Sequence, residues 1–463
     1  MCYDFFSKIG FKKNFFQLGG FVGVTISDLT KKSISGYSSC LSATDSAEHI
    51  ASGVMKPSEI MSECITNIER CEMDVGAWSF MNKDRPLREA SELDKIKPEG
   101  PLFGIPFGVK DNIDTHDMPT GHGTSIYEGE QPSRDAACVA GLRSANAIPL
   151  GKTVCTEFAH RAPGKTANPW NLDYTPGGSS SGSAAAVASG MIPLAIGTQT
   201  TGSVIRPAAY CGVIGYKPTY GDFNVSGVLA NTPSFDTLGF FSREIGDMVL
   251  IRRALLDDSI PLLAYVGLRN VKIGIATEPY WHDACDLNMS MIEQVEKLLS
   301  KAGAQIRKFD GAEAFKNLEQ IGTNVSGYEF ARTLSHERRC FYDRLSPILR
   351  DGRMADGFKI DYSEYVQSIQ AMEKSRLVLD DAMSEVDFVI CPSAPGTASE
   401  GLHETGSAAF NMAWTWLHTP VVTLPIALDT KTKLPLGLQM VVKRHQDDKL
   451  LAHASAVLKY LFS

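Results

Sequence analysis

Two glycine- and serine-rich stretches, residues 176–190 (PGGSSSGSAAAVASG) and 197–221 (GTQTTGSVIRPAAYCGVIGYKPTYG), decide how this chain folds. The first stretch begins as a polar loop and continues with small residues that predict a helix over 183–189, ended by Gly190. Residues 193–197 then predict a buried strand, which leads into a second polar loop, GTQTTGS. A loop, a helix, a strand and a second loop in this order can bring the second loop back to the first. We therefore expect two serine-bearing turns to lie side by side.

Three simpler interpretations of the first loop fail on the sequence. A flexible linker would not lead directly into an alanine-rich helix and a strand. A phosphate-binding loop needs a lysine after its last glycine, where Ser183 stands. Gly178-x-Ser180-x-Gly182 matches the nucleophile elbow of α/β-hydrolases, but that elbow must follow a buried strand, and the preceding NLDYTPGG is polar and broken by proline. The extra serines are expected to be hydrogen-bonding loop residues.

Strands and helices are predicted to alternate on both sides of these loops. Upstream, the expected elements are a strand ending at Lys110, a helix over 134–147 and a strand from 148. Downstream they are strands at 271–276, 304–308, 386–392, 421–424 and 438–442, and helices over 286–301 and 447–461. This alternation predicts an α/β fold with a large mixed, twisted sheet and helices on both faces.

Composition excludes several classes of protein. The chain has 463 residues, of which 43% are hydrophobic, so wholesale disorder is excluded. Its net charge of −8 makes it a poor non-specific binder of nucleic acid or anionic membranes. No apolar run reaches the roughly 18 residues that span a bilayer. No CxxC or HExxH motif occurs, so no metal is expected. No cofactor is expected either, and the expected partner is a small molecule.

Residues 1–40 are expected to form an N-terminal extension before a single domain over 41–463. Lys12 and Lys13 precede an apolar stretch at 15–26, a pattern similar to a degenerate twin-arginine export signal. No clear cleavage site follows, so the alternative is an uncleaved extension. A cytoplasmic location is favoured, with a periplasmic one if residues 1–40 act as a signal.

Cysteines and histidines are expected to be bystanders. The ten cysteines are scattered, so most should be small buried residues in a reducing compartment, Cys211 among them. Serine hydrolases commonly pair serine with histidine, which raises His116, His122 and His160 as candidates. We expect each of them to lie on the surface or on a pocket wall.

Lys110 and the second loop could supply a base and an oxyanion hole. Lys110 ends an apolar strand, where desolvation lowers a lysine pKa and leaves part of the amine neutral, able to act as a base. In a glycine-rich turn such as the one that contains Ser203, several backbone N–H groups can converge on one point, as an oxyanion hole requires.

With these residues the chain resembles the amidase signature family of serine amide hydrolases. The matching stretches are residues 108–115 (GVKDNIDT), 176–190 and 197–221, supported by later segments at 234–248, 387–396 and 410–428. The similarity covers about residues 41–460. It implies the family's α/β fold and a metal-independent hydrolysis of carboxamides.

The resemblance also implies a Ser–cis-Ser–Lys triad. On the matching positions Ser203 is the nucleophile, Ser179 is the bridging serine in a cis peptide, and Lys110 is the base. The implied oxyanion hole uses the backbone N–H groups of Ser203 and of Thr200, Thr201 and Gly202.

The chain departs from the family pattern at three positions. The family commonly has Asp where Gln199 stands and Gly where Thr201 stands. Arg206 follows the nucleophile by three residues rather than two, which resembles the malonamidase-like subgroup. There such an arginine meets a substrate carboxylate, so Arg206 is expected either to bind a carboxylate or carbonyl group or to tie a loop.

The functional expectation is an amidase that converts a small carboxamide to a carboxylate and ammonia or an amine through an acyl-enzyme. The alternative is the glutaminase (A) subunit of a tRNA-dependent amidotransferase, and a non-catalytic scaffold is the third option. Loops at 116–135, 310–380 and 396–418 are expected to form the pocket. Trp414 and Trp416 are expected on one strand face or in a loop, where they would either line the substrate entrance or pack in the core. The substrate is not predicted, and a homodimer stays open.

Overall fold

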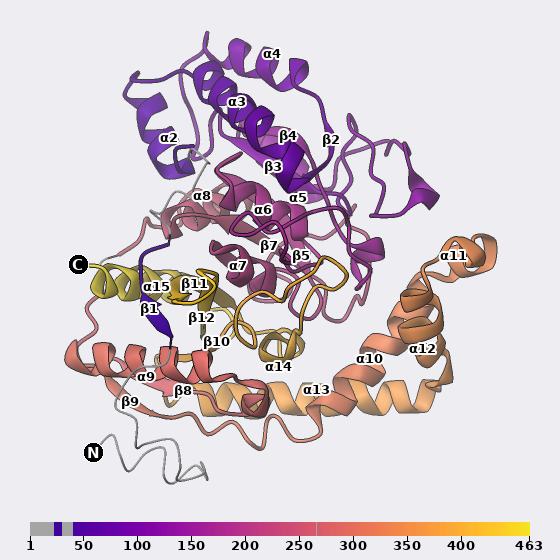
Figure 1. Ribbon diagram of the computed structural model, residues 1–463, viewed down its shortest axis with the longest axis vertical. Coiled ribbons are helices and arrows are strands. Elements are labelled where there is room, and N and C mark those ends of the chain that lie inside the picture. Colours follow the sequence, from indigo (N-terminus) through magenta and orange to yellow (C-terminus); the bar gives the residue numbers. More distant parts are fainter. Residues whose placement is uncertain (1–22, 30–39, 265) are drawn as a thin grey trace.

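The computed structural model describes residues 23–29, 40–264 and 266–463, and its centre is one mixed β-sheet (Figure 1). The strands are β1 (Val24–Ile26), β2 (Trp78–Met81), β3 (Pro106–Lys110), β4 (Ile148–Thr153), β5 (Leu194–Gln199), β6 (Ile214–Lys217), β7 (Thr237–Ser242), β8 (Lys272–Ile275), β9 (Gln305–Lys308), β10 (Phe388–Pro392), β11 (Val421–Asp429) and β12 (Pro435–Val441). The described residues form 12 strands in the order β2-β4-β3-β5-β7-β6-β11-β12-β10-β8-β9, with β1 paired to β11.

Helices cover both faces of this sheet. They are α2 (Ala43–Ala51), α3 (Pro57–Val75), α4 (Asp84–Leu93), α5 (Ala137–Ser144), α6 (Ser181–Ala188), α7 (Ile205–Cys211), α8 (Ile245–Leu255), α9 (Asp286–Lys301), α10 (Leu318–Thr333), α11 (Ser335–Cys340), α12 (Ala355–Lys359), α13 (Tyr362–Met383), α14 (Ala409–Trp416) and α15 (Asp447–Leu461). The fold is therefore the predicted α/β architecture.

Each face of the sheet carries its own apolar core because side chains alternate along a strand. Phe107 and Val109 of β3 pack with residues of α5, α8, α9 and α15. On the other face, Ala195 of β5 packs with residues of α3, α6 and α7. By the same alternation Lys110 lies on the face that carries α6 and α7, and this is the face on which the two serine loops meet.

The structure changes the predicted elements in three places. The helix expected over 134–147 is shorter, since Asn146 adopts a positive φ of 61° that ends it. The strand expected over 421–424 continues to Asp429, because a bulge between Pro425 and Ala427 accommodates the proline. Trp414 and Trp416 belong to helix α14 rather than to a strand or loop, and both are buried.

Residues 310–380, expected as pocket loops, are mainly helical. Figure 1 shows α10 and α13 side by side, in orange, extending away from the sheet toward α11 and α12. A π-helical turn, Ile348–Met354, links the tip of this helical arm (residues 318–383) to α12. The expectation was wrong because α10 is apolar on several sides: Phe330 and Ala331 pack into a small cluster with Leu345 and Leu349, while Val325 packs into another.

Part of the predicted N-terminal extension joins the sheet. Val24–Ile26 pairs with Ala427, Leu428 and Asp429 of β11, and Ser27 N donates to Ile426 O at 2.8 Å. The Lys12–Lys13 pair of the export-signal hypothesis lies outside the described residues, as does most of its apolar stretch. Among the described helices, none is both long and apolar enough to cross a bilayer.

Candidate active site

Lys110 lies at the end of β3, fully buried on the face of the sheet that carries α6 and α7. Its Nζ is 2.7 Å from Ser179 Oγ and 2.8 Å from Thr198 Oγ1, with Thr198 O at 3.5 Å. Burial lowers the pKa of Lys110 to about 7. Part of the amine is therefore neutral near pH 7, and a neutral amine can accept a proton.

Thr198 orients this amine. A neutral amine has two N–H bonds and one lone pair, and the hydroxyl and carbonyl oxygens of Thr198 are acceptors for the two N–H bonds. Asn112 Nδ2 donates to the same Thr198 hydroxyl at 3.1 Å, which fixes the hydroxyl in turn. The lone pair is then left to point at Ser179 Oγ.

Ser179 follows a cis peptide bond from Gly178, at the position where the resemblance implies one. Arg206 holds this turn from behind, since its guanidinium donates to Gly178 O at 2.5 Å and to Gly406 O at 3.0 Å. A side chain at Gly178 would meet Thr405 Cγ2 at 2.8 Å, so only glycine fits this close approach. These contacts of Arg206 are those of a loop tie.

The Ser203 loop is closed by the side chain of Gln199. Its Oε1 accepts from Val204 N at 2.8 Å and from Ile205 N at 3.0 Å, and its Nε2 donates to Thr415 Oγ1 at 2.8 Å. In the part of the chain that is described, the N–H groups of residues 201–203 have no acceptor. The turn therefore presents free backbone donors next to Ser203, which suits an oxyanion hole.

Helix α14 presses directly against this loop. A Cβ on Gly202 would lie 2.5 Å from Asn411 Oδ1, so glycine is required there. Thr415 Oγ1, one turn further along α14, donates to Thr201 O at 2.7 Å. The loop is thus held on one side by Gln199 and on the other by α14.

Asp236 fixes the loop at Thr200. Its Oδ1 accepts from Thr200 Oγ1 at 2.6 Å, and its Oδ2 accepts from Asn231 N at 2.7 Å and from Thr232 N at 2.9 Å. Burial raises the pKa of Asp236, and these three donors lower it. The negative charge of Asp236 also raises the pKa of Lys110.

The structure brings the two serine loops together. Ser180 N donates to Ser203 O at 3.4 Å, and Ser180 Oγ donates to Thr198 O at 3.3 Å. Ser203 is 6% exposed, and within the described residues its hydroxyl makes no hydrogen bond, to Ser179 or to any other group. The structure therefore contains the Lys110–Ser179 contact of the expected triad but no described hydrogen bond between Ser179 and Ser203.

The three histidines take no part in this arrangement. Burial lowers the pKa of His122 to about 4, and its ring stacks on Phe158. His160 lies against the Phe330 ring. No described hydrogen bond joins either of them to Ser179, Ser203 or Lys110. Cys211 is buried, and burial raises the pKa of its thiol.

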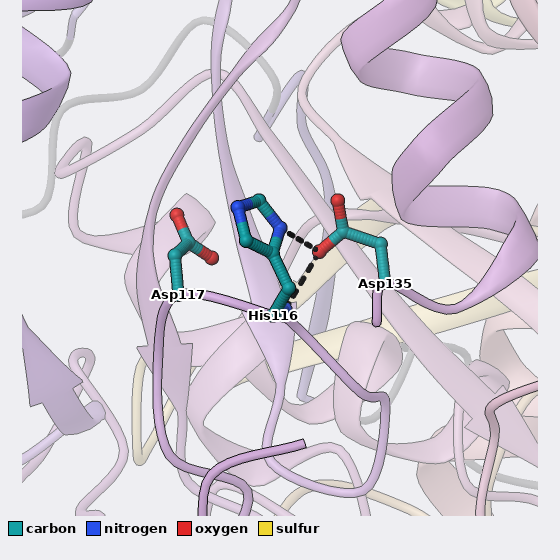
Figure 2. A group of neighbouring side chains, drawn as sticks. All are labelled: His116, Asp117 and Asp135. Carbon is teal, nitrogen blue, oxygen red and sulfur yellow. Dashed lines mark hydrogen bonds and ion pairs between the residues drawn. The ribbon is translucent and has the colours of Figure 1, made fainter. Parts of the chain in front are cut away.

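Figure 2 shows another polar group, His116, Asp117 and Asp135, whose ligand atoms lie close enough together to suggest a metal. Arg143 already donates to Asp117 Oδ2 at 2.7 Å and contacts Asp135 Oδ2 at 3.1 Å, and Arg85 pairs with Asp117 as well. His116 Nδ1 lies 3.0 Å from Asp135 Oδ1. Because two guanidinium groups already balance the two carboxylates, this is an ion-pair cluster.

Sequence reasoning missed four residues that hold the site: Asn112, Thr198, Asp236 and Thr415. All four lie within stretches that match the family, at 108–115, 197–221, 234–248 and 410–428. Asp236 and Thr415 lie 33 and 212 residues after Ser203 in sequence (236 − 203 and 415 − 203). Only the topology brings them to the loop.

The chain is similar to known proteins over a region that includes Lys110, Ser179 and Ser203. The family model for Amidase matches residues 59–451. The chain is 31% identical over 467 residues to the A subunit of the glutamyl-tRNA(Gln) amidotransferase of Endomicrobium trichonymphae, covering 89% of this chain and 95% of that protein. With the same subunit of Sulfurihydrogenibium sp. (strain YO3AOP1) the identity is 29%, covering 87% and 93%. A solved structure described as an amidase superposes with a TM-score of 0.82 at 25% identity, over 90% of this chain and 99% of the other.

Proposed function

Since the chain belongs to the amidase signature family, hydrolases that act on C–N bonds, we propose that it hydrolyses a small carboxamide through Lys110, Ser179 and Ser203. The observation that carries the proposal is the 2.7 Å contact between the buried Lys110 amine and Ser179 Oγ, beside a loop with free N–H donors. The products are a carboxylate and ammonia or an amine.

The first half of the reaction forms an acyl-enzyme. Neutral Lys110 accepts the proton of Ser179, which accepts that of Ser203, while Ser203 Oγ attacks the amide carbonyl. The negative charge on the carbonyl oxygen is held by the backbone N–H groups of the Thr200–Ser203 turn. The C–N bond then breaks, and the proton on Lys110 returns through Ser179 to the leaving nitrogen. A water molecule, deprotonated along the same path, hydrolyses the ester and restores Ser203.

The test is ammonia release from a panel of amides that includes malonamate, glutamine and aromatic and aliphatic amides. Ser203→Ala is run beside the wild type and should abolish release while leaving the thermal unfolding midpoint close to that of the wild type. Activity that survives this substitution would rule out the proposed nucleophile.

Arg206 is proposed to hold the Gly178–Ser179 turn rather than a substrate carboxylate, because its described partners are Gly178 O, Gly406 O and the Thr405 hydroxyl. Arg206→Leu should then lower kcat for neutral and acidic amides alike. A KM increase confined to acidic amides would instead support carboxylate binding.

A second candidate is the glutaminase subunit of a tRNA-dependent amidotransferase. It is favoured by the curated relatives that are subunits of this kind, of which the chain covers more than nine tenths. Glutamine hydrolysis that requires both tRNA and a partner protein would support it. Release of ammonia from simple amides by the isolated chain supports the independent amidase.

A further inference from the structure

One arginine of the helical arm reaches the back of the active site. Arg353 belongs to the π-helical turn Ile348–Met354, and its guanidinium lies 4.5 Å over the Phe330 ring of α10. It donates to Asn231 Oδ1 at 3.0 Å, to Thr232 Oγ1 at 2.6 Å and to Ser326 O at 3.2 Å. All three acceptors are neutral and suit the fork geometry of the guanidinium, and the charges of Arg353 and Asp236 attract each other as well.

Asn231 and Thr232 are clamped between Arg353 and Asp236. Their side-chain oxygens accept from Arg353, while their backbone N–H groups donate to Asp236 Oδ2 at 2.7 and 2.9 Å. The other oxygen of Asp236 accepts from Thr200 Oγ1 at 2.6 Å. Two residues, Thr232 and Asp236, therefore connect Arg353 of the arm by hydrogen bonds to Thr200, in the turn that carries the free N–H donors.

Asn231 connects the same clamp to the other serine loop. Its Nδ2 donates to Phe158 O at 3.1 Å. Phe158 has a φ of 46° and Ala159 a φ of 55°, a left-handed turn that non-glycine residues adopt only when their surroundings hold it. Thr156, at the start of this turn, donates its N–H to Ser179 O at 3.2 Å. Asn231 thus supports both loops, the Ser179 loop through its side chain and the Ser203 loop through its backbone N–H and Asp236.

We propose that Arg353 is a positioning residue: it reaches from the helical arm, clamps Asn231 and Thr232, and through them holds the two serine loops in the relative geometry that acyl transfer needs. Displacing the oxyanion donors or the Ser179 carbonyl by a fraction of an ångström weakens stabilisation of the transition state more than binding of the ground state. Loss of the clamp should therefore lower kcat with little change in KM. The inference rests on the proposed serine mechanism.

The experiment measures how fast Ser203 is labelled by a small fluorophosphonate, in which Ser203 Oγ displaces fluoride and its proton leaves through Ser179 to Lys110. This readout needs the nucleophile and the oxyanion donors but no knowledge of the natural amide. Arg353→Met keeps an apolar chain over Phe330 and removes the N–H fork, and it should slow labelling about 30-fold. The labelling rate of Arg353→Lys should lie between those of the wild type and Arg353→Met. For any amide that the wild type hydrolyses, kcat should drop by a similar factor with KM within about threefold.

Arg350→Met is the matched control. Arg350 lies on the same turn, bonds Asp351 at 2.9 Å and lies 5.2 Å from the centre of the Tyr342 ring, without a described contact to Asn231 or Thr232. Its substitution should leave labelling within about twofold of the wild type. Thr232→Val leaves the arm unchanged and removes the hydroxyl that accepts from Arg353 and donates to Asn231 Oδ1 at 3.2 Å. It should slow labelling, and combined with Arg353→Met it should add less than its own effect.

Each other result overturns the inference. Labelling of Arg353→Met at the wild-type rate, or slowed no more than in Arg350→Met, would make Arg353 a merely structural arm residue. An increase in KM alone would place Arg353 in contact with the substrate. If Arg353→Met fails to fold by thermal unfolding, wild-type labelling of folded Thr232→Val rejects the clamp. Labelling that persists in Ser203→Ala, or none in the wild type, removes the serine mechanism itself.

Discussion

Two neighbouring strands of the sheet, β3 and β4, each bury a lysine near the carboxyl end, and the two lysines differ in what surrounds them. Lys110 contacts two hydroxyls, those of Ser179 and Thr198. Lys152 donates to Ile113 O at 2.5 Å and to Thr120 Oγ1 at 2.7 Å, and the charge of nearby Asp111 raises its pKa. Burial lowers the pKa of both amines, to about 7 for Lys110 and about 8 for Lys152.

The comparison shows that burial alone does not make a lysine a base. Each amine contacts one backbone carbonyl and two hydroxyls, and the partners of Lys152 (Ile113 O and the hydroxyls of Thr115 and Thr120) tie the 113–120 segment to the sheet. Lys110 faces a serine hydroxyl that has a second serine beyond it. What lies beyond the hydroxyl partner therefore separates the two lysines, and four predictions test that separation.

The largest effect is expected for Lys110→Met. Without the base, kcat/KM for the amide that the wild type hydrolyses best should fall by about 10³-fold or more. The equivalent Lys152→Met variant should stay within about tenfold when assayed below its unfolding temperature. Equal losses in both variants would erase the distinction between the two lysines.

Lys152→Met should instead cost stability. It leaves Ile113 O and the Thr120 hydroxyl without their donor in a buried place, at about 1–3 kcal/mol for each unpaired group. We expect the free energy of unfolding in urea to fall by about 3 kcal/mol, with a smaller change for Lys110→Met. A Lys152→Met protein as stable as the wild type would contradict the structural role.

The pH dependence of kcat/KM should report Lys110. Only the neutral amine accepts a proton, so activity should fall about tenfold per pH unit below a pKa near 7 and level off above it. Lys152→Met should show the same acid limb. If that limb moves in Lys152→Met, Lys152 rather than Lys110 controls the reacting proton.

The smallest effect is expected from the hydroxyl partners. Thr198→Val removes the acceptor that orients the Lys110 amine and should lower kcat about tenfold, while Thr198→Ser keeps the hydroxyl and stays near the wild type. Thr120→Val makes the matching change beside Lys152 and should leave kcat unaltered. A loss of kcat in Thr120→Val as large as in Thr198→Val would contradict the different roles of the two lysines.

The catalytic half of the molecule was predictable because its local sequence is restrictive. Gly178 and Gly202 stand where any side chain would collide with Thr405 or Asn411, and the serine loops are joined by one short helix and one short strand. The sequence therefore predicted the α/β sheet, which is confirmed, and it named Lys110, Ser179 and Ser203, whose loops the structure brings together. Their pairwise contacts, including the missing bond at Ser203, needed the fold.

The helical arm was not predictable in the same way. Its helices bury apolar residues on more than one side, so their periodicity is weak, and its links to the site come from single polar residues. Arg353 and its partner Thr232 are 121 residues apart, and no local pattern marks either of them. Asp236 and Thr415 lie in stretches that match the family, but no local pattern marked them as partners of the loop that carries Ser203.

The pairing of Val24–Ile26 with β11 bears on how the amino terminus can be handled. Proteolytic trimming at any bond between Ile26 and Ala43 would cut this strand off from helix α2 and leave it held only by its pairing with β11 and by the packing of Val24 and Ile26 on the core. Engineered versions that start at residue 41 should thus expose the backbone groups of β11 at residues 427–429, which a second molecule could then pair with. Tags for purification belong before Gly23 or after the last helix.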